Sequence, residues 1–184
     1  MSGEADGIAA WRATDLALED WAKVTAVEDD ALPEAGGPDA VELREVTAEN
    51  VRSICRLAVG PSQSSFVAPN AVSLAQAMFE PKAWYRAIYA GERPVGFAML
   101  SIDTETPTYY LWRFMIGADY QGRGYGRAAI AAIVAHVRSL PGATELLVSW
   151  VPAEGGPEPF YLGLGFVPTG KVEDGEVEGR LALD

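Results

Sequence analysis

The sequence predicts an α/β fold with a mixed sheet, and three observations carry that prediction. The β-rich segments "AWYRAIYA" and "RPVGFAMLSI" are separated only by Gly91 and Glu92, as in a hairpin. The segment "TYYLWRFMI" is apolar almost throughout, which is typical of a central strand. Strand and helix patterns alternate along the rest of the chain, as they do in α/β proteins.

Before the hairpin, the sequence indicates one strand and two helices. Residues 41–46, "VELREV", alternate apolar and polar residues as a strand does. "TAENVRSICRLAV" follows as a helix, with Thr47 as its expected N-cap and Cys55 as a buried thiol between apolar positions. A second helix is expected over residues 71–80, and Pro81 ends it.

After the central strand, the sequence indicates a long helix and three further strands. Ile130, Ile133 and Val137 share one face of a helix expected over residues 124–138, and Pro141 stops it. "TELLVSW" is the next strand, and "PEPFYLGLG" is a short helix. The segments "GFVPTGK" and "VEGRLAL" complete the sheet.

The acidity of the chain is concentrated ahead of the first strand. The net charge is -12, and residues 1–40 hold ten acidic residues against two basic ones. We therefore predict two parts. Residues 1–40 form an acidic N-terminal extension, partly helical over residues 10–27, and residues 41–184 form one globular domain.

The composition excludes several classes of function. Because the chain has no basic stretch, we expect no binding to nucleic acid. No apolar run approaches the roughly 20 residues of a membrane span, and the start of the chain does not resemble a signal peptide, so we expect a cytoplasmic protein without membrane contact. Cys55 and His136 are the only residues of their types, so we expect no metal site.

The segment "YQGRGYGRAA" joins the central strand to the long helix, a junction that commonly presents backbone N–H groups to phosphates. A nucleoside-triphosphate P-loop would need Lys and Ser or Thr where Arg123 and Gly124 stand. A dinucleotide fingerprint can be read through Gly124 and Gly126, but the next strand ends in Trp150 instead of an acidic residue. A turn that serves only tight packing would leave Arg123 and Arg127 unexplained.

A fourth pattern, [Q/R]-x-x-G-x-[G/A], fits the same loop and its context. With an apolar strand before it and "FYLGLGF" further along, the chain resembles the GNAT superfamily of N-acetyltransferases over roughly residues 41–183. The resemblance implies a GNAT fold with a mostly antiparallel sheet flanked by helices, acetyl-CoA as acetyl donor and, at family level, a homodimer. The residues expected to bind the coenzyme A diphosphate are Gln121, Gly122, Arg123, Gly124, Tyr125, Gly126 and Arg127.

The resemblance also implies where the chemistry takes place. Backbone groups of Phe114, Met115 and Ile116 are expected to receive the acetyl thioester and the pantetheine amides, and an N–H group there would stabilise the oxyanion. Tyr161 matches the tyrosine that protonates the departing thiolate in many relatives. Relatives commonly have an asparagine ahead of that tyrosine where this chain has Glu154, so the usual asparagine contact with the cofactor is lost.

The acceptor amine must lose a proton before it attacks, because an alkylammonium has a pKa of about 10.4. The sequence does not single out the base. The candidates are Asp103 and Glu105, in the loop before the central strand, and Glu80, at the end of the second helix.

Longer segments, including "FVAPNAVSLAQA" and "FYLGLGFVPTGKVEDGEVEG", resemble bacterial spermidine/diamine N-acetyltransferases. We therefore expect a small-molecule amine substrate, and the resemblance points to a polyamine or diamine such as spermidine. The alternatives are an acetyltransferase for another small amine, an antibiotic or a protein or peptide amine, and a non-catalytic sensor that binds acyl-CoA. The candidate residues for the ammonium groups are the aromatic Trp84, Tyr109, Tyr110 and Trp112 and the acidic Asp103 and Glu105.

Overall fold

The computed structural model describes residues 34–183, so the helix expected over residues 10–27 lies outside the described residues. The folded unit begins at Glu34. The Gly36 N–H donates to the Ala90 carbonyl at 2.9 Å, and the short helix η3 (Pro38–Ala40) follows. The predicted boundary at residue 40 therefore falls inside the folded unit.

Seven strands form one sheet in the order β1-β2-β3-β4-β5-β7-β6. Neighbouring strands are antiparallel, except that β4 and β5 run parallel. This arrangement confirms the predicted α/β class and the mixed, mostly antiparallel sheet. The strands are β1 (Val41–Arg44), β2 (Ala83–Ala90), β3 (Arg93–Asp103), β4 (Thr108–Ile116), β5 (Glu145–Trp150), β6 (Val167–Glu173) and β7 (Glu176–Ala182).

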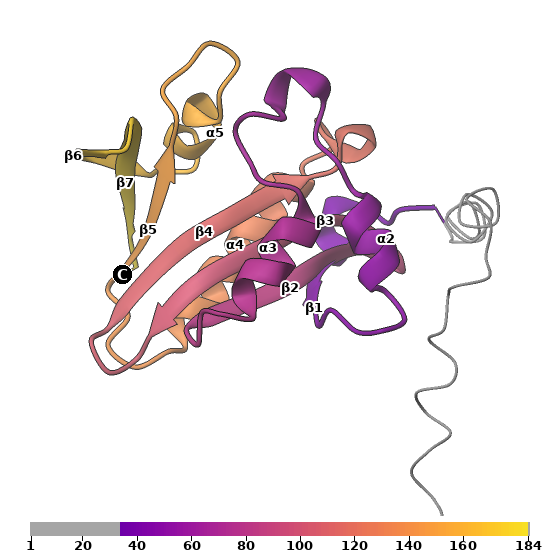
Figure 1. The fold of residues 1–184 in the computed structure, drawn as a ribbon, viewed down its shortest axis with the longest axis horizontal. Helices are drawn as coiled ribbons and strands as arrows, with labels where there is room; N and C mark the ends of the chain where they lie inside the picture. The colour runs from indigo at the N-terminus through magenta and orange to yellow at the C-terminus, as the bar shows by residue number, and fades with distance from the viewer. Residues whose placement is uncertain (1–33, 184) are drawn as a thin grey trace, which may run out of the picture. The chain divides into compact units, whose positions relative to one another are not determined.

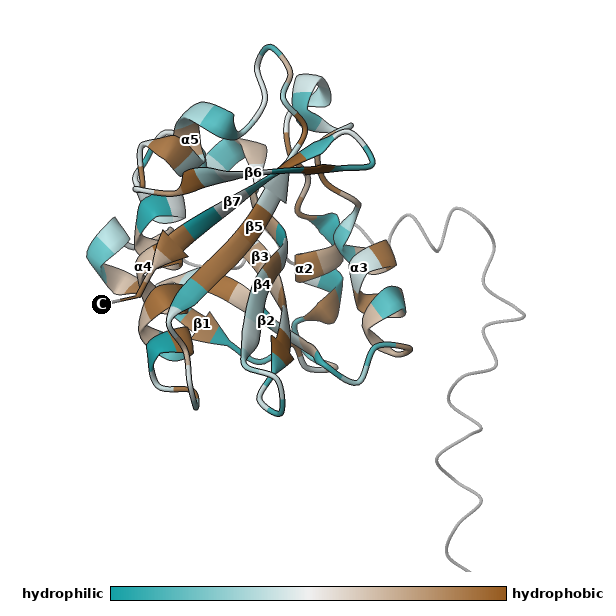
Figure 2. Ribbon diagram, turned by 90° about the vertical axis from the view of Figure 1, so that its left-hand side faces the viewer, coloured by the Kyte–Doolittle hydropathy of each residue, from teal (hydrophilic) through white to brown (hydrophobic). Residues whose placement is uncertain are grey.

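Helices cover both faces of the sheet (Figure 1). α4 (Tyr125–Arg138) lies behind β2–β4 in that view, and α2 (Val51–Arg56) and α3 (Asn70–Ala77) lie in front. The shorter elements are η4 (Pro61–Gln63), η5 (Ala118–Tyr120) and α5 (Glu158–Leu162). Each face buries its own apolar cluster, with Ile130 and Ile133 on the α4 side and Ile54 and Phe97 on the other. Figure 2 shows hydrophobic residues along the strands and hydrophilic residues at many turns.

Three local predictions differ from the structure. α2 begins at Val51, so Thr47 is not its N-cap; instead the Thr47 N–H donates to the Asn50 side chain at 2.8 Å. Cys55 is exposed and not buried, because in this short helix Ile54 occupies the inward position and its neighbour points outward. α3 ends at Ala77, before the proline that was expected to stop it.

The feature that positions the site is the separation of β4 from β5. The two strands pair only through Tyr110 with Leu147 and Leu111 with Val148. Beyond these pairs, β4 runs on to Ile116 beside β3, while β5 runs on beside β7. A cleft of about 1320 Å³ opens where the strands separate.

Candidate active site

The cleft is lined by segments that are far apart in the sequence. β4 contributes residues from Tyr110 to Ile116, and the loop before α3 contributes residues 63–69. The glycine-rich loop and the start of α4 line one end. α5 contributes Tyr161, and the β6–β7 hairpin contributes acidic side chains.

The glycine-rich loop has the backbone conformation of an anion-binding turn. Gly122 has φ +74° and Gly124 has φ +86°, both in the left-handed region that favours glycine. α4 begins directly after Gly124 and runs for 14 residues. The first N–H groups of a helix have no partner within it, and the helix dipole makes this end positive. The loop therefore fits a phosphate group.

Several of the predicted cofactor-binding side chains hold this loop in place. The Gln121 amide donates to the Ile116 carbonyl and to the Gln63 side chain, both at 2.9 Å. The buried Tyr125 hydroxyl donates to the Gly36 carbonyl at 2.6 Å. These bonds tie the loop to β4, to the segment before α3 and to the start of the folded unit.

The two arginines of the loop differ in position. Arg127 lines the cleft and donates one hydrogen bond to the Gly163 carbonyl at 3.2 Å. Arg123 is exposed and does not line the cleft. Gly126 also lines the cleft, and a Cβ atom there would come within 3.2 Å of the Phe160 ring, so this glycine lets α4 approach α5.

The end of β4 is held on both sides by packing. Phe114 stacks on Phe160 with ring centroids 5.9 Å apart. The buried Met115 sulfur lies 3.7 Å from the Asn70 amide nitrogen, which comes from the start of α3. Phe114, Met115 and Ile116 all line the cleft, and no residue of β5 pairs with them in the described sheet.

Tyr161 lines the cleft from α5 and is only 6% exposed. Its ring stacks on Trp150 at 5.6 Å and meets Phe166 edge to face at 5.5 Å. Burial, and to a lesser degree the nearby Tyr110, raises the pKa of the Tyr161 phenol well above its ordinary value. The phenol therefore keeps its proton at neutral pH and can act as a donor.

Only some of the residues predicted to bind the acceptor line the cleft. Trp112 lines it, and the Arg113 guanidinium lies 5.1 Å above the Trp112 ring. Arg113 donates to the Gln76 side chain at 3.3 Å, and burial lowers its pKa. Of the other aromatic candidates, Tyr110 also lines the cleft, whereas the hydroxyl of the buried Tyr109 donates to a backbone carbonyl.

The remaining predicted residues lie elsewhere. Trp84 stacks on His136 of α4 at 4.2 Å. Asp103 forms an ion pair with Lys82 at 2.6 Å, which lowers the pKa of its carboxyl, and accepts the Glu105 N–H at 3.0 Å. The residues that do not line the cleft are Trp84, Tyr109, Glu80, Asp103 and Glu105.

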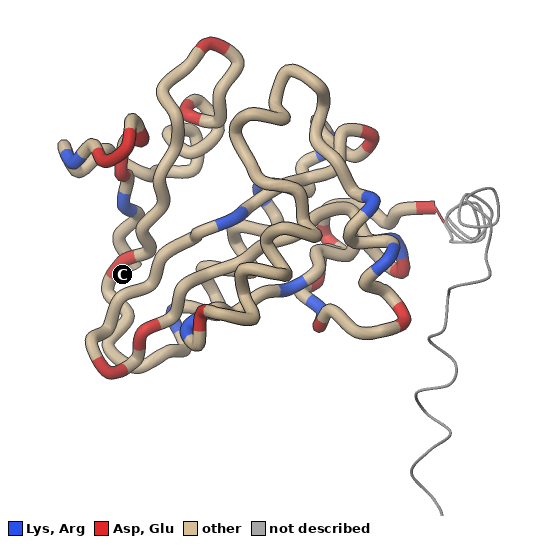
Figure 3. The backbone as a smooth tube through the Cα atoms, in the orientation of Figure 1, with Lys and Arg blue, Asp and Glu red and all other residues tan. Residues whose placement is uncertain are grey.

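Acidic residues gather in the β6–β7 hairpin, on the opposite side of the molecule from the glycine-rich loop (Figure 3). Their carboxylates line the cleft. They are Glu173, Asp174, Glu176 and Glu178, and one cation, Lys171, lies among them. The Lys171 ammonium is 2.8 Å from Glu173 and 3.6 Å from Glu178. Sequence reasoning missed this group, because only the fold brings the hairpin to the cleft.

The segment before α5 reaches the cleft through its backbone. Gly155 and Gly156 line the cleft, whereas Glu154 does not. A Cβ atom on Gly156 would lie 2.8 Å from the Ala153 carbonyl oxygen, so this tight turn depends on glycine. Among residues 34–183, no group of three or more His, Cys, Asp or Glu side chains could hold a metal ion. No helix in the same part of the chain is long and apolar enough to cross a membrane.

A strand that separates from its parallel neighbour, followed by a glycine-rich loop and a helix, defines a class of proteins that bind acyl-coenzyme A. The acetyltransferase (GNAT) family model matches residues 62–166, more than half of the chain. The chain therefore belongs to this family, and it is an acetyl-CoA-dependent N-acetyltransferase.

Known proteins agree with this assignment. Spermine/spermidine N(1)-acetyltransferase of Bacillus subtilis strain 168 is 30% identical over 111 residues, which cover 55% of this chain and 70% of the relative. A probable spermine N(1)-acetyltransferase of the natto strain BEST195 matches to the same extent.

Solved structures share the fold at lower identity. Spermidine N-acetyltransferase of Vibrio cholerae, in complex with CoA and spermine, superposes with a TM-score of 0.62 at 15% identity, over 79% of this chain and 96% of that chain. An acetyltransferase of Thermus thermophilus superposes with a TM-score of 0.60 at 21% identity, over 78% of this chain and 97% of that chain.

Proposed function

We propose that this protein moves an acetyl group from acetyl-CoA to a primary amine of a polyamine or diamine, such as spermidine, by direct attack of the amine on the thioester. The observation that carries the proposal is that the two ends of one cleft differ in charge. One end has the glycine-rich loop and the positive end of α4, and the other has four carboxylates. The names of the two Bacillus relatives support a polyamine acceptor.

The donor end suits the diphosphate of coenzyme A. Successive N–H groups at Gly122, Gly124 and the start of α4 can receive its oxygens, and Arg127 can add a charge-assisted hydrogen bond. Arg123 lies at the exposed side of the same loop. The unpaired edge of β4 between Trp112 and Ile116 can then hold the pantetheine amides and polarise the thioester carbonyl.

The acceptor end suits a molecule with more than one ammonium group. Four carboxylates and one lysine leave a negative balance in the hairpin. The Trp112 ring lines the cleft but already has the Arg113 guanidinium 5.1 Å from its centroid, so we assign the ammonium groups to the carboxylates. Arg113, on the α3 side, would repel an ammonium group, so the distal amines of the acceptor extend toward the hairpin.

Tyr161 is the proposed general acid for the departing thiolate. Its burial raises its pKa and keeps it protonated, and it lines the cleft that we propose holds the thioester. Tyr161→Phe removes the proton and keeps the stacking on Trp150, so we expect kcat to fall by roughly 10²-fold or more while the Kd for CoA changes little. Turnover measured by thiol release and Kd measured by calorimetry test this, and an unchanged kcat would contradict the role.

One assay separates the substrate classes. The full chain is incubated with acetyl-CoA and, in turn, spermidine, putrescine, an aminoglycoside and a lysine peptide, and free thiol is followed. We expect release with spermidine or putrescine. Release with the peptide alone would contradict the polyamine acceptor, and CoA binding without release from any amine would favour an acyl-CoA sensor.

A charge variant tests the acceptor end directly. Glu173→Gln combined with Asp174→Asn should raise the KM for spermidine more than the KM for butylamine, because only spermidine has distal ammonium groups. Glu145→Gln is the matched control, since Glu145 is also a sheet carboxylate but does not line the cleft. Equal KM changes for both amines would show that the hairpin carboxylates do not bind the distal ammonium groups.

A further inference from the structure

The proposed reaction needs a group that removes a proton from the acceptor. At pH 7 an alkylammonium with a pKa of about 10.4 is almost wholly protonated and cannot attack. None of the acids that the sequence suggested for this task, Glu80, Asp103 and Glu105, lines the cleft. The proton must therefore leave by another route.

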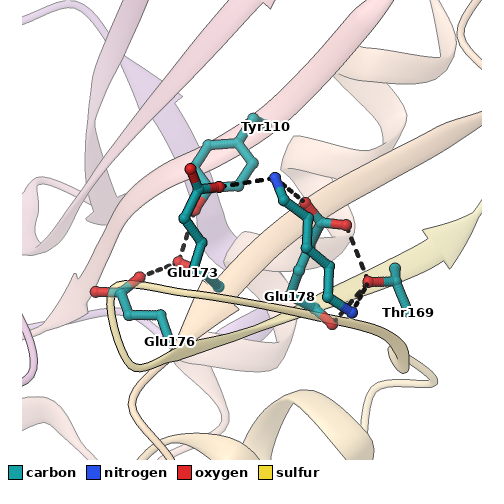
Figure 4. Close-up of polar contacts among 7 residues, drawn as sticks. Tyr110, Thr169, Glu173, Glu176 and Glu178 are labelled. Atoms are coloured by element: carbon teal, nitrogen blue, oxygen red, sulfur yellow. Dashed lines mark hydrogen bonds and ion pairs between the residues drawn. The ribbon is translucent and has the colours of Figure 1, made fainter.

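Three side chains that all line the cleft are linked by hydrogen bonds, from the half-buried Tyr110 to the exposed Glu176. The Tyr110 hydroxyl lies 2.6 Å from the Ser149 hydroxyl, and Ser149 is in turn hydrogen-bonded to the Glu176 carboxylate (Figure 4). The three residues come from β4, β5 and β7, which are adjacent in the sheet. Glu176, the last residue of this hydrogen-bonded series, is exposed.

The direction of these hydrogen bonds follows from chemistry. An ionised carboxylate can only accept, so Ser149 donates to Glu176. The Ser149 oxygen then accepts from Tyr110, whose own hydroxyl is the donor. The Tyr110 oxygen keeps lone pairs that can accept a hydrogen bond from an amine in the cleft. Both hydrogen bonds of this series thus have their donors on the Tyr110 side and their acceptors on the Glu176 side.

The hydrogen-bonded series begins where β4 and β5 separate, which is where we propose that the acetyl group meets the amine. Tyr110 belongs to one of the two residue pairs that join β4 to β5, and Ser149 directly follows the other pair. Tyr110 and Tyr161 both line the cleft, so the proposed acid and the first residue of the hydrogen-bonded series face the same space.

The charged groups around Tyr110 favour a hydroxyl that passes a proton on. Burial raises the pKa of Tyr110, and Glu176 and Glu178 raise it further, while Ser149 and Arg113 act in the opposite direction. Tyr110 is therefore protonated at rest and does not store a negative charge. Of the hairpin's other charges, Lys171 is paired with Glu173 and Glu178.

We propose that Tyr110, Ser149 and Glu176 form a proton relay that deprotonates the acceptor amine. This inference rests on the proposed function. The ammonium N–H bond breaks and its proton passes to the Tyr110 oxygen; the Tyr110 proton passes to Ser149, and the Ser149 proton to Glu176. Glu176 returns the proton to water, and the amine keeps the electron pair with which it attacks. Tyr110 is the catalytic residue, while Ser149 and Glu176 are positioning residues that act through it.

Two variants separate a relay from a simple effect of charge. Ser149→Ala breaks the chain but leaves every charge in place, and Glu176→Gln removes the final acceptor. We expect both to lower kcat at pH 7 by about 10²-fold, with a smaller change in KM. Ser149→Thr keeps the hydroxyl and should retain most of the activity. Glu145→Gln, outside the cleft, should match the unaltered protein.

The pH dependence gives a readout that a merely structural role would not move. As the pH rises toward 10, the free amine becomes abundant without help from the relay. The activity ratio between the unaltered protein and Ser149→Ala should therefore shrink from about 10²-fold toward about one. The double variant Ser149→Ala/Glu176→Gln should be no slower than either single variant, because the residues act as one unit.

The outcomes distinguish this inference from the proposed function. If the unaltered protein acetylates polyamines and Ser149→Ala has the same kcat at pH 7, the relay is overturned and the proposed function stands. A loss that is equal at every pH, in folded variants with normal CoA affinity, also overturns the relay. If the unaltered protein releases no thiol with any amine, the proposed function fails, and the relay fails with it.

Discussion

Replacing Gly124 with alanine tests why the cofactor loop needs glycine. Gly124 has φ +86°, and an L residue in the left-handed region costs about 1–2 kcal/mol. An added Cβ would lie 3.4 Å from the Pro38 Cβ, an ordinary contact that adds little to this cost. We therefore expect Gly124→Ala to lower the free energy of unfolding by about 1–2 kcal/mol, which corresponds to a fall in Tm of roughly 2–8 °C for a chain of this size.

Two further variants separate backbone strain from access of the ligand. Asparagine tolerates the left-handed region, so Gly124→Asn should regain much of the lost stability but still place a side chain beside the phosphate site. Gly170→Ala is the control for strain alone, since Gly170 has φ +90°, an added Cβ would have no neighbour within 4 Å, and the residue does not line the cleft. Urea unfolding gives the stability and calorimetry gives the Kd for CoA. An alanine variant as stable as the unaltered protein would refute the strain argument, and normal CoA affinity in Gly124→Asn would refute the requirement for close approach.

The remaining predictions concern the start of the folded unit and the histidine. A chain that begins at Val41 should be about 1–3 kcal/mol less stable than one that begins at Glu34, because the buried Tyr125 hydroxyl loses its acceptor at Gly36. Urea unfolding compares the two, and equal stability would show that residues 34–40 contribute nothing. The pKa of His136 is lowered by burial and by a nearby arginine, so the unfolded state binds the proton first and stability should fall as the pH drops below about 6.5. His136→Gln should remove that part of the slope between pH 7.5 and 5.5, and an unchanged slope would contradict the assignment.

The elements with strong sequence patterns could be predicted closely. The hairpin of β2 and β3 and the whole of β4 match their predicted segments, because long apolar runs between turn residues leave few alternatives. α2 was harder, since a short helix gives little periodicity. Its start depends on the Asn50 side chain, which forms a turn with Thr47, and its single fully buried position is Ile54 and not Cys55.

The two ends of the site differ in how much the sequence reveals of them. The proposed donor end could be located in the sequence because Gln121, Gly124 and Gly126 lie within one short loop whose chemistry is local. The acceptor end could not, because it depends on strand register. Ser149 lies opposite Glu178 in the pairing of β5 with β7, and this register cannot be predicted from the sequence of either segment. Asp103 was an equally plausible acid until the fold placed it beside Lys82, outside the cleft.

The same contrast shows on which parts of the fold the proposed donor and acceptor ends depend. Parallel strands need a crossover, and here α4 is part of the crossover between β4 and β5, so its positive end lies just beyond the point where those strands separate. The proposed donor end therefore depends on a single connection between adjacent elements. The proposed acceptor end comes from the β6–β7 hairpin, whose carboxylates can change without altering that connection. The relay from Tyr110 to Glu176 crosses from the first of these parts to the second, which is why acceptor chemistry in this protein should depend on the hairpin even when donor binding does not.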